Sequence, residues 1–235
     1  MKFILQVALD LLNQDRAIKI AKMSIEGGAD WIEAGTPLIK SEGIKVVRSL
    51  KKNFPDKKIV ADMKIMDTGA FETEMASKAG ADIICILGVA DDSTIKEALK
   101  SARKYGSKLM VDLIGVKDKI KRAEELEKIG IDYLCIHVGI DEQMLGKKAT
   151  ETLKKIVKKT NIPLAVAGGI NSETASEMAN SGASIIIVGG AITKAKDVKT
   201  ATKKIKKAIE KKQKIKSDLF KKYDKTEIKK AFEMV

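Results

Sequence analysis

The sequence of 235 residues has little of several residue types that often identify a function: two cysteines, one histidine and 4% aromatic residues. Cys85 and Cys135 lie in separate apolar runs without a neighbouring cysteine at metal-binding spacing, which predicts buried thiols rather than a zinc site. No run approaches the roughly 18 apolar residues of a membrane helix, and the N-terminus lacks a signal-peptide pattern. We therefore expect a cytoplasmic protein.

Charge is unevenly distributed along the chain. The net charge is +13, but the segment from Lys194 to Val235 alone holds 16 lysines against six acidic residues. The preceding body is nearly neutral, so an argument for a nucleic-acid partner concerns only this tail. Only Phe220, Tyr223 and Phe232 there could stack on bases, and we interpret the lysines as a solvated helix face. Nucleic-acid binding remains an alternative of another functional class.

Apolar runs alternate with segments of helical spacing along most of the chain. We expect strands at residues 3–9, 30–34, 58–63, 82–87, 108–114, 132–137, 163–167 and 185–188. We expect helices at residues 14–26, 41–52, 69–79, 92–104, 118–129, 147–159, 172–180 and 196–212. Eight such units predict an α/β protein with a (β/α)8 TIM barrel over residues 1–212, in preference to a doubly wound open sheet of five or six strands.

A repeated glycine supports this count. Gly28, Gly80, Gly130 and Gly182 each stand between an expected helix and the next strand, at intervals of 52, 50 and 52 residues. Each interval holds two βα units, so four intervals close a ring of eight. A glycine just past a helix end can adopt the left-handed conformation that a short connection needs.

The chain continues beyond the expected barrel as a C-terminal helical extension, residues 213–235. Apolar residues recur there in two short stripes, separated by a segment from Asp224 to Glu227 that is typical of a helix N-terminus. We expect two basic amphipathic helices that pack on the barrel or on a neighbouring subunit.

In a barrel of this type the active site lies at the C-terminal ends of the strands. The polar residues at the expected strand ends are Asp10, Glu33, Asp62 with Lys64 and Asp67, Asp112, and His137. Alternate residues of a strand share a face, so Asp62 and Lys64 point the same way, and Asp67 can converge with them from the following loop. Charges at the end of a buried strand are costly unless they are paired, hydrated or bound to a metal.

The last two expected strands end in glycine pairs, Gly168-Gly169 and Gly189-Gly190. Bare backbone amides at these two strands form the phosphate site of many barrels, although tight turns alone could also require glycine. Glu33 and Asp62 lie on adjacent strands and could supply oxygen ligands for Mg²⁺. His137, the only histidine, stands at the predicted mouth, where a base that titrates near neutrality is useful.

Four segments together resemble a known family: Gln6 to Asp10, Glu33 to Gly43, His137 to Asp141, and the D-x-K-x-x-D motif of residues 62–67. They are similar to the 3-hexulose-6-phosphate synthases of the orotidine-5′-phosphate decarboxylase suprafamily. The resemblance covers about residues 3–193, and the stretch from Thr36 to Gly43 is its most specific part. It does not include the tail.

The resemblance implies a Mg²⁺-dependent, reversible aldol reaction of D-ribulose 5-phosphate with formaldehyde through an enediolate. By motif, Glu33 and Asp62 would hold Mg²⁺, Lys64 would stabilise the enediolate and His137 would be the general base. Asp10 would contact substrate and orient Lys64. The resemblance also implies a homodimer in which Asp67 reaches into the partner's site. We further expect Asp112 and the two glycine pairs to contact the phosphosugar.

Two sibling activities are less similar to this chain. The nucleotide decarboxylases share the D-x-K-x-x-D motif but have a lysine where Glu33 stands here. The 3-keto-L-gulonate-6-phosphate decarboxylases typically have an arginine directly after the histidine of the sixth strand, where this chain has Val138. This second activity is the nearest enzymatic alternative.

Overall fold

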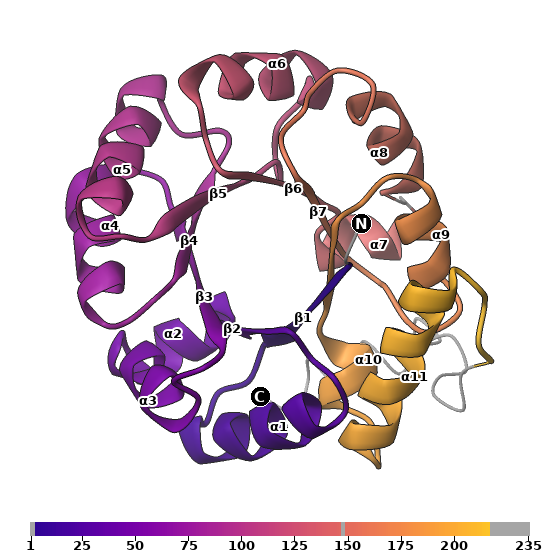
Figure 1. Ribbon diagram of the computed structural model, residues 1–235. Helices are drawn as coiled ribbons and strands as arrows, with labels where there is room; N and C mark the ends of the chain where they lie inside the picture. Colours follow the sequence, from indigo (N-terminus) through magenta and orange to yellow (C-terminus); the bar gives the residue numbers. More distant parts are fainter. Residues whose placement is uncertain (1–2, 147–148, 217–235) are drawn as a thin grey trace.

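The alternating segments form a closed barrel of eight parallel strands, as seen in the computed structural model, which describes residues 3–146 and 149–216 (Figure 1). Neighbouring strands pair in chain order, and β8 closes the ring against β1. The predicted (β/α)8 fold is confirmed. The strands are β1 (Ile4–Leu9), β2 (Trp31–Ala34), β3 (Lys58–Ile65), β4 (Ile83–Leu87), β5 (Lys108–Asp112), β6 (Tyr133–His137), β7 (Leu164–Ala167) and β8 (Ile185–Val188).

Helices surround the barrel (Figure 1). They are α1 (Gln14–Glu26), α2 (Thr36–Glu42), α3 (Lys45–Asn53), α4 (Gly69–Lys78), α5 (Asp92–Lys104), α6 (Lys119–Ile129), α7 (Ile140–Met144), α8 (Thr150–Ile156), α9 (Ala175–Asn180), α10 (Gly190–Thr193) and α11 (Val198–Lys211). The short helices α2, α7 and α10 were not predicted. The helix expected at residues 41–52 begins only at Lys45, because Gly43 has a positive φ of 71° that ends α2 before α3 begins.

The four repeated glycines have the predicted conformation. Their φ angles are 102°, 97°, 84° and 104° for Gly28, Gly80, Gly130 and Gly182. A side chain at these positions would strain the backbone, so glycine permits each short turn from a helix into the next strand.

An aspartate two residues after three of these glycines joins adjacent strands at the opposite end of the barrel from the strand C-termini. The side chains of Asp30, Asp82 and Asp132 accept hydrogen bonds from a backbone amide near the start of the preceding strand, at 2.8, 2.8 and 2.9 Å. Each also forms an ion pair with a lysine. The repeated glycine and the aspartate that follows it thus form a structural repeat that stabilises the fold. The repeat lies at the N-terminal face of the barrel, where catalysis is not expected.

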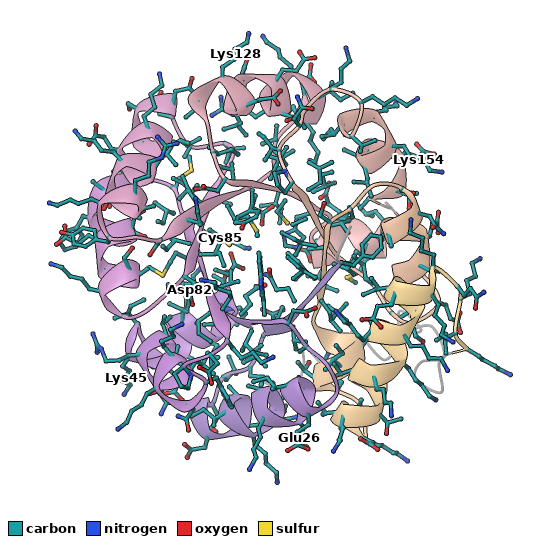
Figure 2. The ribbon with its side chains drawn as sticks, in the orientation of Figure 1. Glu26, Lys45, Asp82, Cys85, Lys128 and Lys154 are labelled. Carbon is teal, nitrogen blue, oxygen red and sulfur yellow. The ribbon has the colours of Figure 1, made fainter. Side chains whose placement is uncertain are left out.

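The barrel has two hydrophobic layers. The larger lies between the strands and the surrounding helices, and the smaller fills the inside of the barrel. Cys85 lies inside the ring of strands, whereas Glu26, Lys45 and Lys128 project outward from the helices (Figure 2). The inner layer also contains Trp31, Val60, Met110 and Cys135, among others, and both cysteines are buried free thiols, as predicted. The interior is therefore a packed core and not a channel.

The described chain ends in contact with the barrel. After α11, the amide of Gln213 donates to the carbonyl of Ala208, and the amide of Ile215 donates to the carbonyl of Ser172 beside α9. The tail predicted at residues 213–235 is described only as far as Lys216: residues 213–216 are not helical, and residues 217–235 lie outside the described part. The lysine-rich segment behind the nucleic-acid alternative begins at Lys194, so only its first part, which includes α11, is described. Within residues 3–146 and 149–216, none of the helices has the length and apolar character needed to cross a membrane.

Candidate active site

The side chains that face into the barrel change from apolar to charged at the C-terminal ends of the strands. Glu33, Asp62, Asp112 and His137 each stand two residues beyond an inward-facing residue of the inner core, respectively Trp31, Val60, Met110 and Cys135. Because alternate side chains of a strand point to the same face, all four charged or polar side chains lie at the same opening of the barrel. Three of them, Glu33, Asp62 and Asp112, are buried.

Lys64 joins this group through an irregularity in β3. The pairing register with β4 shifts between Ala61 and Ile65, and Lys64 has a φ of 48°, in the left-handed region. Such a conformation is uncommon for a residue with a side chain, and strained positions cluster at functional sites. It directs the Lys64 ammonium to Oδ2 of Asp62 at 2.8 Å and to Oδ2 of Asp112 at 3.4 Å. The expected proximity of Asp62 and Lys64 is present.

Asp112 connects Lys64 to His137. Its Oδ2 lies 2.8 Å from Nδ1 of His137, and its Oδ1 accepts a hydrogen bond of 2.9 Å from the amide of Ile114. Burial alone would raise the pKa of Asp112, but the hydrogen bond from His137 and the charges of His137 and Lys64 outweigh it, so this pKa is lowered. An ionised Asp112 can only accept a hydrogen bond from Nδ1 of His137, and with the proton on Nδ1 the other ring nitrogen, Nε2, would be the one able to accept a proton.

The same charges keep Lys64 protonated. Burial lowers the pKa of the Lys64 ammonium, but Asp62 and Asp112 raise it by more, and the net shift is well upward. Lys64 is thus a fixed positive charge at the barrel mouth, rather than a proton donor or acceptor near neutral pH.

Asp62 has a second partner that the sequence interpretation missed. The hydroxyl of Thr36, the first residue of α2, lies 2.8 Å from Oδ2 of Asp62 and 2.8 Å from its backbone oxygen. A buried threonine that follows a strand end can act in this way, but its partner is 26 residues away in the chain, so local spacing gave no signal.

Glu33 is the most strongly perturbed acid of the group. Its pKa is raised well above the ordinary value, first by burial and then by the negative charges of Asp62 and Asp10, although a hydrogen bond of 2.5 Å from the Gln6 amide opposes the shift. A buried carboxylate next to other acids is costly to ionise unless a cation compensates for its charge.

The carboxylates of Glu33 and Asp62 fit a hard cation such as Mg²⁺, whose remaining ligands would come from substrate and water. Among the described residues, no group of three or more His, Cys, Asp or Glu side chains could enclose a metal. Glu33 and Asp62 could contribute two carboxylates, which is a usual protein contribution to a Mg²⁺ site. The hydrogen bonds of the Asp62 carboxylate are made at Oδ2, so Oδ1 is the oxygen that can face such a cation.

Asp10 lies between two glycines. A Cβ at Gly35 would overlap Oδ1 of Asp10, and one at Gly189 would lie 3.2 Å from Oδ2. Asp10 is exposed to solvent at the barrel mouth, yet partial desolvation by the surrounding protein and the charge of Asp62 raise its pKa, and the charge of Lys64 opposes them. Lys64 therefore acts on Asp10 through space, because its hydrogen bonds go to Asp62 and Asp112. The predicted orienting role of Asp10 is not carried by direct contact.

The glycine pairs stand at the predicted strand ends. Gly168 and Gly169 have φ angles of 107° and 65°, and a Cβ on Gly169 would lie 2.8 Å from Oε1 of Gln143. Gln143 is itself fixed by a hydrogen bond of 2.8 Å from its Nε2 to the carbonyl of Val138. Gly189 precedes α10 and Gly190 begins it. Tight turns and close packing already require glycine at 168 and 169, so phosphate binding by the two pairs stays a prediction.

Asp67 does not converge with Asp62 and Lys64 within one chain. It is exposed after β3, and its Oδ1 accepts a hydrogen bond of 2.7 Å from the amide of Thr68. Among the described residues, the printed contacts of Lys64 go to Asp62 and Asp112 and that of Asp67 to Thr68, so the expected convergence of the three charges of the motif is not seen within the single chain.

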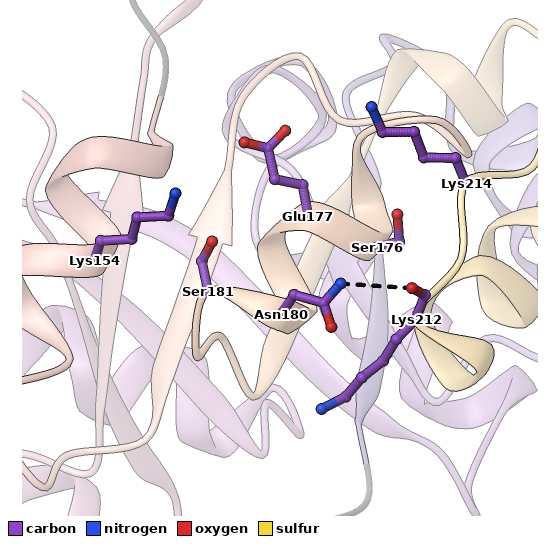
Figure 3. Close-up of a pocket in the computed structure, with 7 residues that line it drawn as sticks. All are labelled: Lys154, Ser176, Glu177, Asn180, Ser181, Lys212 and Lys214. Carbon is purple, nitrogen blue, oxygen red and sulfur yellow. Dashed lines mark hydrogen bonds between the residues drawn. The ribbon is translucent and has the colours of Figure 1, made fainter.

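The hollow in Figure 3 is separate from this group. It lies on the outer surface between α8, α9 and the segment after α11, and its wall includes Lys154, Glu177 and Lys214. A hydrogen bond of 3.5 Å from Asn180 to the carbonyl of Lys212 crosses it. No strand end contributes to its wall, so it adds nothing to the chemistry of the barrel mouth.

The raised pKa of Glu33 predicts a gain in stability when this charge is removed. The folded state binds the proton more tightly than the unfolded chain, so stability falls as the pH rises above the ordinary range of a glutamate. In a chelator, Glu33→Gln should raise Tm, by more at pH 8 than at pH 5, with about 2–4 °C for each kcal/mol. The control is Glu97→Gln, at an exposed position on α5. A difference in Tm between variant and parent that does not change with pH would contradict the burial of this charge.

A family model described as Orotidine 5′-phosphate decarboxylase / HUMPS family matches residues 4–205. The chain belongs to this family. It is 45% identical over 208 residues to a 3-hexulose-6-phosphate synthase of Bacillus subtilis (strain 168), in a match that spans 87% of this chain and 98% of the relative. The chain is thus an enzyme of this family, and the resemblance predicted from its motifs is confirmed.

Solved structures of the family have the same fold. The 3-hexulose-6-phosphate synthase of Salmonella typhimurium superimposes with a TM-score of 0.86 at 37% identity, over 91% of this chain and all of that one. KGPDC of Streptococcus mutans gives a TM-score of 0.81 at 29% identity, over 90% of this chain and 99% of that one. The family relationship therefore extends over the whole barrel and its strand ends.

Proposed function

We propose that this enzyme joins D-ribulose 5-phosphate and formaldehyde to give D-arabino-hex-3-ulose 6-phosphate, reversibly and with Mg²⁺. The observation that carries the proposal is the continuous contact from Asp62 through Lys64 and Asp112 to His137 at the barrel mouth. It combines a fixed cation with an oriented base, which an aldol reaction through an enediolate needs. The similarity to 3-hexulose-6-phosphate synthases supports this choice of substrates.

The chain's own groups provide the proton transfers. Nε2 of His137 takes the proton from the carbon next to the ketose carbonyl, and the electron pair left behind forms the enediolate. That carbon then attacks formaldehyde, and the new carbon–carbon bond converts the formaldehyde oxygen into an alkoxide. The His137 imidazolium returns its proton to this alkoxide, so the base is regenerated. Asp112 holds the imidazole in position throughout, through the Nδ1 hydrogen bond.

Electrostatic stabilisation of the enediolate has two sources. Lys64 presents a positive charge that is fixed by two carboxylates and needs no reorganisation during the reaction. Glu33 and Asp62 would hold Mg²⁺, which supplies further positive charge to polarise the ketose carbonyl. The glycine pairs would bind the phosphate, away from the reacting carbon.

Loss of formaldehyde that depends on added ribulose 5-phosphate tests this function directly. The parent should consume formaldehyde with Mg²⁺ and lose most of the activity in a chelator, and Glu33→Ala or Asp62→Ala should be almost inactive in Mg²⁺. Full activity in the chelator would contradict the metal assignment. No consumption of formaldehyde under any condition would contradict the reaction itself.

We also propose a homodimer with shared sites. Several large apolar side chains are exposed in the loops and first helical turn that follow β1, β3 and β4, and two of them, Met66 and Phe71, flank Asp67 in the sequence. They are Leu12, Met66, Phe71 and Val89, with exposed fractions of 65%, 53%, 70% and 43%. Exposed apolar side chains of this size at the strand C-terminal end of the barrel favour a protein partner. A second copy that covered them would bring Asp67 towards the mouth of the other barrel, where one chain leaves it unused.

Mixing two inactive variants tests the shared site. Asp67→Ala and Lys64→Ala chains should each be inactive as homodimers. If Asp67 serves the partner's site, a mixed dimer contains one site with both residues intact and one site that lacks both. Subunit exchange should therefore restore up to about one quarter of the parent activity, since half of the dimers are mixed and each has one working site. No recovery after exchange has been verified by mass spectrometry would show that each chain uses its own Asp67.

The second candidate is decarboxylation of 3-keto-L-gulonate 6-phosphate. Solved decarboxylases of this kind superimpose closely, with a TM-score of 0.80 at 27% identity for the enzyme of Vibrio cholerae. Val138 is a weaker argument against it than expected. The side chain is buried in the layer between the strands and the helices. An arginine at position 138 would be buried away from the mouth, so the parent's rates on the two substrates decide between the activities.

A further inference from the structure

Gln6 is a polar side chain in the apolar interior of the barrel. It lies on β1 and is completely buried. Its neighbours in register are Trp31 on β2 and Ile187 on β8, which both belong to the inner hydrophobic core. A buried amide is costly unless each of its polar atoms has a partner.

Only half of the Gln6 amide is satisfied. Nε2 donates a hydrogen bond of 2.5 Å to Oε2 of Glu33, whereas Oε1 is buried and has no hydrogen-bond partner among the described residues. A methionine would fill nearly the same volume without an unsatisfied acceptor. The choice of glutamine therefore does not follow from packing or stability, and the contact with Glu33 is what distinguishes it.

We infer that Gln6 is a positioning residue that fixes the carboxylate of Glu33 for the cation; this rests on the metal assignment in the proposed function. The amide occupies Oε2 from inside the barrel and leaves Oε1 as the oxygen that faces the cation. Without the amide, the negative charges of Asp62 and Asp10 would repel an ionised Glu33 and let it turn away.

The second carboxylate has an equivalent support. Thr36 places its hydroxyl 2.8 Å from Oδ2 of Asp62, from a buried position. Each of the two acids is thus held on one oxygen by a neutral protein donor while the other oxygen stays available. Partners that orient metal ligands commonly affect metal affinity by about 10–100-fold.

The test compares Gln6→Met with the parent by Mn²⁺ binding, measured on the full chain from the EPR signal of free Mn²⁺. Gln6→Met should weaken Mn²⁺ binding about 10–100-fold, while Tm stays the same or rises because the unsatisfied acceptor is gone. The matched control is Ser107→Ala. It removes a buried hydrogen bond of 2.8 Å to the carbonyl of Ala81, far from the strand C-termini, and should lower Tm without changing Mn²⁺ affinity.

The outcomes separate this inference from the proposed function. If the parent binds Mn²⁺ and Gln6→Met binds it equally well, the positioning role is wrong and the metal assignment stands. If Gln6→Met lowers Tm and leaves Mn²⁺ affinity unchanged, Gln6 is a structural residue only. A parent that binds no Mn²⁺ would overturn the metal assignment and the role of Gln6 together.

Discussion

Replacing Lys64 by methionine is expected to lower kcat by about 10²–10³-fold. The ammonium is the only cation in hydrogen-bonding contact with both Asp62 and Asp112 in the described structure, and no other side chain can take its place beside a developing enediolate. The steady-state rate of formaldehyde consumption, with ribulose 5-phosphate saturating, measures the effect. KM should change less than kcat, because the charge stabilises the transition state more than the bound ketose.

The matched control is Lys58→Met. Lys58 also pairs with an aspartate, Asp82, but at the exposed opposite end of β3. An exposed pair of this kind contributes little to stability, so the variant should keep the parent's kcat. A Lys64→Met enzyme that retained more than one tenth of the parent's kcat would remove Lys64 from the mechanism.

Replacing His137 by asparagine is expected to lower kcat by about 10²–10⁴-fold, the usual contribution of a general base. The effect of this substitution on proton abstraction can be measured separately from carbon–carbon bond formation. In D₂O without formaldehyde, the parent should exchange the proton next to the ketose carbonyl, which proton NMR follows as loss of signal. His137→Asn should lose this exchange while it still binds Mn²⁺, since His137 contacts neither proposed metal ligand in the described structure.

Asp112→Asn provides an independent check on the same step. Its amide cannot hold the imidazole proton on Nδ1 as an ionised carboxylate does, so the population with a basic Nε2 should fall. Exchange should slow in this variant as well. Exchange at the parent's rate in His137→Asn would assign proton abstraction to another residue, whatever the effect of Asp112→Asn.

Much of the fold followed from short-range patterns in the sequence. The alternation of apolar runs located every strand, and β8 was predicted with its observed bounds. Gly28, Gly80, Gly130 and Gly182 indicated the repeat because their positive φ angles depend on local backbone geometry. The short helices α2, α7 and α10 were missed because four to seven residues provide too little periodicity to distinguish a helical turn from a loop.

The candidate site was predictable as a set of positions but not as a set of contacts. Strand-end polarity singled out Asp62, Lys64 and His137, since the barrel gathers its strand ends at one opening. The link from Asp112 to His137 spans 25 residues, and the left-handed conformation of Lys64 has no marker such as glycine. Gln6 is visible in the sequence as a polar residue within an apolar strand. Its contact with Glu33 is not, because that contact depends on how β1 pairs with β2.

The two thiols inside the barrel bear on the chemical durability of the enzyme. Formaldehyde adds to thiolates, so an enzyme proposed to use it as a substrate is exposed to an alkylating agent at its own active site. Burial, and then the negative charges at the strand ends, raise the pKa of Cys85 and Cys135 well above the ordinary value. Both therefore stay as unreactive thiols. Covalent damage by formaldehyde would fall on the surface amines of the many lysines, where a modified side chain leaves the inner core intact.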